Sequence, residues 1–79
     1  MVDIVEKTVV YQGSLRIYKV TFSNNDVRYF VAKYFDTTYN YIVNYGVKCY
    51  ISPNKDFSPI IFETTQHKAL LMPIRYIGN

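Results

Sequence analysis

The sequence predicts an all-β fold with room for one short helix: a small, curved meander or barrel of five to seven antiparallel strands. Val, Ile, Thr, Tyr and Phe supply 37 of the 79 residues, whereas Ala occurs twice and Leu three times. Such β-branched and aromatic side chains fit a pleated, half-buried surface. Turn-forming residues separate runs of alternating character, and a chain of this length builds one small core. Residues 1–79 are therefore expected to form a single β-rich domain.

The first two strands are expected at Val2–Tyr11 and Leu15–Phe22. Gln12-Gly13 breaks the run with a glycine that accepts a positive φ, which predicts a hairpin. A two-residue loop at this place puts Glu6 opposite Lys19 as a favourable cross-strand pair of charges.

A third strand is expected at Val27–Phe35, after the turn-forming stretch Ser23–Asp26. An even-numbered loop puts Phe22 opposite Val27 and thereby sorts the side chains onto two faces. The expected core face is interrupted by Lys7, Arg16 and Lys33, and it carries Val5, Val9, Tyr11, Tyr18, Val20, Phe22, Val27, Tyr29, Val31 and Phe35.

Asp36–Gly46 fits two structures. As a helix it has an Asp at its start, a Gly at its end and apolar residues at helical spacing. As a strand it alternates tyrosine and valine with asparagine, and Tyr and Asn are mediocre helix formers. We favour the extended form, with a three-residue hairpin loop at Asn44–Gly46.

The rest of the chain predicts strands at Val47–Ser52 and Phe57–Glu63, joined by a turn at Pro53–Asp56. Pro59 cannot donate to a ladder, which favours an edge strand or a bulge. A short helical turn at Gln66–Leu71 and a last strand at Ile74–Ile77 complete the prediction. This order of elements is similar to the oligonucleotide-binding (OB) barrel and to SH3-like barrels, in architecture but not in any sequence motif.

No catalytic pattern is present in the sequence. His67 is the only histidine and Cys49 the only cysteine, so neither a metal site nor a disulfide within the chain is expected. The carboxylates are dispersed, and three glycines are too few for the usual phosphate-binding loops. We therefore expect a protein that is not an enzyme and needs no cofactor.

Aromatic and basic residues are interleaved, a combination that binds single-stranded nucleic acid through phosphate neutralisation and base stacking. The net charge of +3 agrees with such a partner without requiring it. The predicted nucleic-acid-binding surface consists of Lys19, Arg28, Phe30, Tyr34, Lys48 and Tyr50.

The alternative is a protein-binding module or inhibitor that uses a tyrosine-rich face or a free strand edge, and a homodimer would suit so small a core. The sequence contains no signal peptide and no apolar run long enough for a membrane span, so we expect an intracellular, cytoplasmic protein. Tyr, Ile, Phe, Asn and Lys have AT-rich codons, which is compatible with a virus or another mobile element acting inside a host cell.

Overall fold

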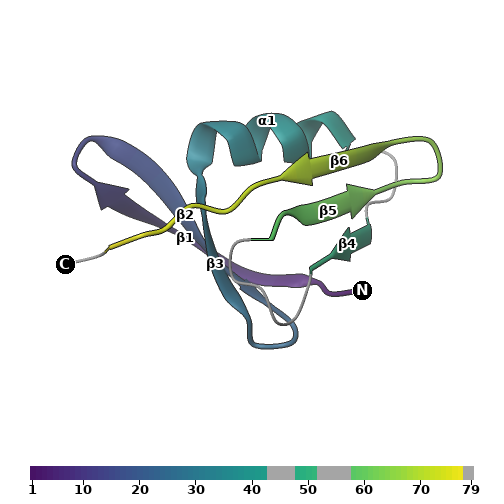
Figure 1. The fold of residues 1–79 in the computed structure, drawn as a ribbon, viewed down its shortest axis with the longest axis horizontal. Helices are drawn as coiled ribbons and strands as arrows, with labels where there is room; N and C mark the ends of the chain where they lie inside the picture. Colours follow the sequence, from purple (N-terminus) through teal and green to yellow (C-terminus); the bar gives the residue numbers. More distant parts are fainter. Residues whose placement is uncertain (43–47, 52–57, 78–79) are drawn as a thin grey trace.

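The fold is a pair of three-stranded antiparallel sheets with one helix packed against both (Figure 1). It was obtained as a computed structural model, which describes residues 1–42, 48–51 and 58–77. The first sheet has the order β1-β2-β3 and the second β4-β5-β6. The elements are β1 (Ile4–Gln12), β2 (Leu15–Phe22), β3 (Val27–Val31), α1 (Ala32–Ile42), β4 (Lys48–Tyr50), β5 (Ile60–Glu63) and β6 (Lys68–Leu71). The prediction of a mostly-β chain with five to seven antiparallel strands and room for one helix is confirmed, and the number of strands is six.

The two sheets are joined by one bridge at each end. The amide of Val2, ahead of β1, donates to the carbonyl of Cys49 in β4 at 2.8 Å. The amide of Ile74, beyond β6, donates to the carbonyl of Tyr29 in β3, also at 2.8 Å. Within the described ranges the ladders close no barrel, because each junction between the sheets is a single residue long.

The first hairpin has a two-residue loop, at Gly13-Ser14 instead of Gln12-Gly13. Gly13 takes a φ of 64° at the first loop position, as a type II′ turn requires. Lys19 therefore pairs with Thr8, and the predicted pair with Glu6 is wrong. Because the shift amounts to two residues, the faces of β2 and of β1 from Glu6 onward are unchanged. A bulge between Ile4 and Glu6 turns Ile4 to the core side, opposite Phe22.

The second hairpin has a three-residue loop, and this reverses the faces of β3. The amide of Phe22 donates to the carbonyl of Asp26, and Asn25 occupies the left-handed region with a φ of 71°. Val27 consequently pairs with Thr21, so the predicted pairing with Phe22 is wrong. A shift of one residue turns each side chain of a strand to the opposite face. Arg28 and Phe30 therefore point into the core.

Helix α1 begins directly after Val31, so the predicted third strand ends four residues early and the extended form of residues 36–42 is wrong. Ala32, Phe35 and Tyr39 are spaced for one face of a helix. The ring of Phe35 lies 5.5–6.0 Å from four others, those of Tyr18, Phe30, Tyr39 and Phe62. Burial among rings from both sheets outweighs the weak helix propensity of the segment. The predicted loop at Asn44–Gly46 lies outside the described residues.

The core lies between the two sheets and α1. It consists of Tyr18, Val20, Phe22, Phe30, Ala32, Phe35, Cys49, Ile60, Phe62 and Leu71. The predicted core face was right for the central strand β2 and for Phe35. It was wrong for the exposed side chains of Val5, Val9, Tyr11 and Val27, which lie on the two outer strands of the first sheet.

The second sheet differs from its prediction at Pro59 and in the segment from β6 onward. Pro59 precedes β5, which is the middle strand, so the expected edge or bulge is wrong. β6 is a strand and not a helical turn, and the strand expected at Ile74–Ile77 reduces to the bridge at Ile74. The turn expected at Pro53–Asp56 lies outside the described residues.

Candidate nucleic-acid interface

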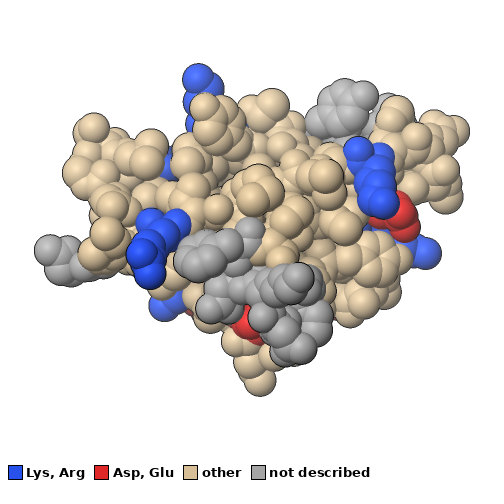
Figure 2. Space-filling model, in the orientation of Figure 1, with Lys and Arg blue, Asp and Glu red and all other residues tan. Residues whose placement is uncertain are grey.

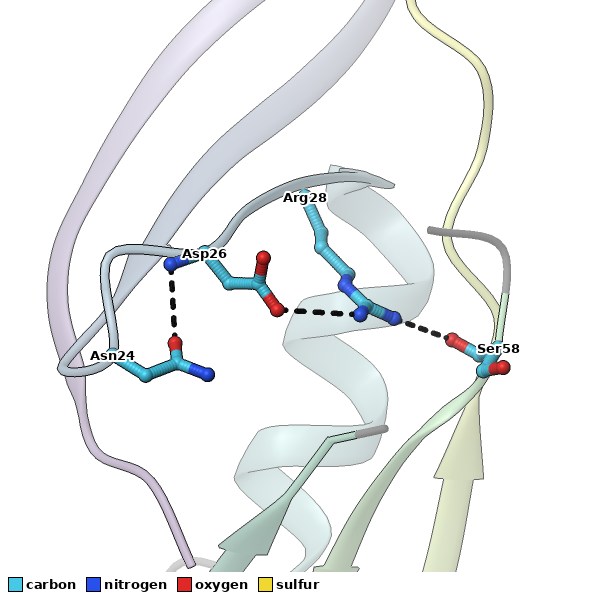
Figure 3. A network of polar contacts seen from close by, with 4 residues as sticks. All are labelled: Asn24, Asp26, Arg28 and Ser58. Carbon is cyan, nitrogen blue, oxygen red and sulfur yellow. Dashed lines mark hydrogen bonds and ion pairs between the residues drawn. The ribbon is translucent and has the colours of Figure 1, made fainter. Parts of the chain in front are cut away.

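Arg28 and Phe30 belong to the interior of the protein. The side chain of Phe30 is fully buried, and Arg28 is only 3% exposed. The guanidinium of Arg28 donates to the carbonyl of Ser58 at 3.0 Å and to the carboxylate of Asp26 at 3.4 Å (Figure 3). Asp26 is held in turn by a bond from its amide to the side chain of Asn24. Arg28 thus ties β3 to the segment before β5, and its predicted place on an outer surface is wrong.

The other four predicted residues lie on three separate surfaces. Lys19 is on the outer face of the first sheet, opposite Tyr29. Tyr34 is exposed on α1. Lys48 and Tyr50 flank the buried Cys49 and so project from the outer face of the second sheet. The structure does not bring the six residues together. In the view of Figure 2, Lys and Arg side chains likewise stand at several separate places on a largely uncharged surface.

Tyr18 is surrounded by charged side chains at the edge of the core. Its hydroxyl donates to the carboxylate of Asp36 at 2.8 Å. The amino group of Lys7 lies 4.5 Å from the centre of the Tyr18 ring, and the guanidinium carbon of Arg16 lies 5.4 Å from it. The hydrogen bond to Asp36, with burial and the negative charge of that carboxylate, raises the pKa of Tyr18, which the nearby Arg16 only partly offsets. Lys7, Arg16 and the hydrogen-bonded carboxylate of Asp36 therefore meet around Tyr18 at the edge of the core.

A surface pocket of about 360 Å³ opens beside this cluster. The pocket is lined by residues from the start of β2, the end of β3 and the first part of α1. These residues are Leu15, Arg16, Val31, Ala32, Lys33, Tyr34 and Asp36. The residue before the helix is Val31, whose side chain offers no acceptor to the amides of the first turn. The positive end of the helix, Arg16 and Lys33 all lie at this pocket, and among its described lining residues only Asp36 carries a carboxylate.

Two exposed rings flank the same region. Tyr11 is paired with Arg16 across the hairpin and is 60% exposed, and Tyr34 is exposed to the same degree. We call Lys7, Tyr11, Arg16, Lys33 and Tyr34 the hairpin–helix surface. It combines three cations with two accessible rings around an apolar pocket.

No protein-family model, curated protein or solved structure matches this chain. The hairpin–helix surface must therefore be interpreted from its own chemistry. Because phosphate binds to cations and helix N-termini while bases stack on rings, its composition suits a single-stranded nucleic acid.

The sequence contained a signal for this surface, but its interpretation as part of a core face was wrong. Lys7, Arg16 and Lys33 appeared as three interruptions of an otherwise apolar core face. The closed end of the β1–β2 hairpin projects beyond the second sheet (Figure 1), so this part of the face meets solvent. Lys33 belongs to the helix, which turns its side chain to the pocket beside Arg16. Lys7 and Arg16, repeated on one face of the hairpin, indicated that this face is not fully covered.

Neither Cys49 nor His67 belongs to this surface. Cys49 is buried, and burial raises the pKa of its thiol to about 11. His67 lies in the turn between β5 and β6, where its amide donates to the hydroxyl of Thr64 at 2.8 Å. The described residues contain no cluster of three or more potential metal ligands. None of their helices is long and apolar enough to cross a membrane.

Proposed function

We propose that this chain is a small, non-enzymatic protein that binds single-stranded nucleic acid at the hairpin–helix surface. The observation that carries the proposal is the pocket beside α1, where two cations and a helix N-terminus surround an apolar cavity with an exposed tyrosine at its rim. β1 adds Tyr11, which lies opposite Arg16, and Lys7, whose amino group lies over the ring of Tyr18.

In the proposed binding mode, some residues bind a phosphate and others contact the bases. Arg16, Lys33 and amides of the first turn of α1 neutralise a phosphate. One base enters the pocket against Leu15 and Val31, and its neighbour stacks on a tyrosine ring. A base can enter such a pocket only when it is unpaired and unstacked, so the proposal specifies a single strand and not a duplex.

Affinity for a fluorescent oligonucleotide, measured by anisotropy over a range of salt concentrations, tests the proposal. Arg16→Gln and Lys33→Gln should each lower the affinity about tenfold and reduce the salt slope by about 0.7. Tyr34→Ala should lower the affinity about tenfold or more through loss of one stacking contact. Lys68→Gln is the matched control, because Lys68 is exposed but lies in the second sheet opposite Glu63.

Equal losses in Lys68→Gln and Arg16→Gln would show that only net charge matters and would contradict a defined site. An affinity that ignores salt would contradict the phosphate contacts. A duplex of the same sequence that binds as tightly as the single strand would contradict the pocket.

A partly open barrel of the OB or SH3-like type is part of the same proposal. Its support is the pair of bridges that join β1 to β4 and β3 to the segment after β6. With these two bridges included, strand pairing continues around all six strands, as in small barrels that bind oligonucleotides.

A protein-binding module or inhibitor of viral or mobile-element origin is the second candidate. It is favoured by an outer row of the second sheet, in which Tyr50, Ile61 and Leu70 stand side by side and Leu70 is well exposed. Absence of nucleic-acid binding, together with loss of one stoichiometric partner protein in Leu70→Lys, would support this candidate instead.

A further inference from the structure

Between Ile4 and Gln12, one edge of β1 is not paired with any described residue. It is an outer strand of its sheet and nine residues long. Val5, Val9 and Tyr11 on it are 62%, 42% and 60% exposed. A long strand edge with apolar side chains is a template for pairing with another strand.

The hairpin determines which backbone groups this edge presents. Gln12 and Leu15 close the two-residue loop and exchange hydrogen bonds. Hydrogen-bonded and non-bonded pairs alternate from there along the ladder. Lys7, Val9 and Tyr11 are therefore the residues whose N–H and C=O groups point away from β2.

We infer that β1 pairs in antiparallel fashion with β1 of a second copy of this chain, about a two-fold axis at Val9. Such an axis can pass through any of the three outward residues, or through Thr8 or Val10 between them. An axis at Lys7 places two lysines opposite each other, which is unfavourable. An axis at Tyr11 leaves most of the edge unpaired, because β1 ends at Gln12. An axis at Thr8 or at Val10 pairs only two of the outward residues with one another, whereas the axis at Val9 pairs all three.

The side chains in this register are compatible with one another. Val9 faces Val9 of the second copy, and Lys7 faces Tyr11 of the second copy, whose ring can accept the lysine stem and charge. On the other face, Glu6 meets Gln12 and Thr8 meets Val10, so no like charges are directly opposed. The pairing ends where Val5 meets Gly13 of the second copy, and the bridge from Val2 to Cys49 is left intact.

The result is one six-stranded sheet with both hairpins side by side. Residues opposite each other across an antiparallel pair project to the same face. Lys7 and Tyr11 of both copies then lie on one side of the sheet, which places two hairpin–helix surfaces next to each other. The pairing itself does not depend on the proposed nucleic-acid binding.

Sedimentation equilibrium of the full chain without nucleic acid tests the inference. Val9→Lys opposes two lysines across the axis, and Val9→Pro removes the outward amide of each copy at a position where an edge strand tolerates proline. Each should raise the dissociation constant of the dimer at least about tenfold. Val27→Lys is the matched control, because Val27 is also a strand valine that is 42% exposed and should leave the dimer unchanged.

The register has a test of its own. Cα atoms of facing, hydrogen-bonded residues lie about 5.5 Å apart, within the range that a disulfide spans. Val9→Cys should therefore form a covalent dimer under mild oxidation, and Val27→Cys should not. A wild-type chain that stays monomeric at millimolar concentration overturns the inference, as does an equal loss of dimer in Val27→Lys. A dimer whose Val9→Cys form does not cross-link overturns the register. If Val9→Pro fails to fold, Val9→Lys and Val9→Cys still test the inference.

Discussion

Replacement of Phe35 by alanine should remove at least about a third of the stability of this protein. Phe35 is 1% exposed and is the only residue whose ring contacts aromatic rings from β2, β3, β5 and its own helix within the described part of the chain. It connects the helix to both sheets at once, and no neighbour can fill the space that its ring occupies without leaving other ring contacts.

The magnitude follows from the size of the lost side chain and of the domain. Truncating a buried phenylalanine to alanine costs about 3–5 kcal/mol, including the cavity it leaves. A chain of this length has a total unfolding free energy of about 4–12 kcal/mol. Phe35→Ala should therefore lower the unfolding free energy by about 4 kcal/mol, and Phe35→Leu, which refills part of the cavity, by about 1–2 kcal/mol.

Urea unfolding monitored by circular dichroism measures this loss, with Tyr34→Ala as the matched control. Tyr34 is the adjacent helical residue and is 60% exposed, so its truncation should change the unfolding free energy by no more than about 0.5 kcal/mol. A Phe35→Ala protein that loses less than about 1 kcal/mol would refute the aromatic cluster as the centre of the fold. So would a Tyr34→Ala protein that loses as much.

Three further predictions follow from buried polar groups. Arg28→Ala should lower the unfolding free energy by about 2–3 kcal/mol, since the Ser58 carbonyl loses its guanidinium donor; unchanged urea stability would contradict this. The raised pKa of Tyr18, held mainly by its bond to Asp36, means that its stabilisation is present below pH 10 and is lost as the pH rises through the folded-state pKa. Stability of Tyr18→Phe should therefore fall less steeply above pH 10 than that of the wild type, and parallel curves would refute the assignment. With a pKa of about 11, Cys49 should react with a thiol reagent at pH 8 about a hundredfold more slowly in the native protein than after unfolding. Equal rates would show an accessible thiol.

The faces of β1 and β2 could be predicted because their alternation is strong and their loop has two residues. The faces of β3 could not, because they depend on whether the second loop holds an odd or an even number of residues. Ser23–Asp26 is rich in turn formers of several kinds, and a three-residue loop became identifiable only from the left-handed Asn25 and the bond between Phe22 and Asp26. One residue of loop length decided whether Arg28 met solvent or the core.

The location of the candidate site could not be predicted from the sequence either. Chemistry that suits nucleic acid was visible in the composition, but its location required knowledge of where the core ends. Lys7 and Arg16 lie on the core side of the first sheet and yet reach solvent. Arg16 lies near the closed end of the hairpin, which extends past the second sheet, and Lys7 lies on the outer strand β1. Alternation along a strand reports which face a side chain takes and not how far along the strand that face is covered.

The sequence by itself determined a mostly-β chain, the approximate positions of β1, β2, β4 and β5, and the interleaving of rings with cations. These properties depend on neighbouring residues along the chain, which the sequence contains directly. The tertiary structure alone decided that residues 32–42 are a helix, that Arg28 is a buried link between β3 and Ser58, and that Arg16 and Lys33 share one pocket. Those outcomes depend on contacts between segments distant in the sequence, whose packing energy exceeds the small differences among local conformational preferences.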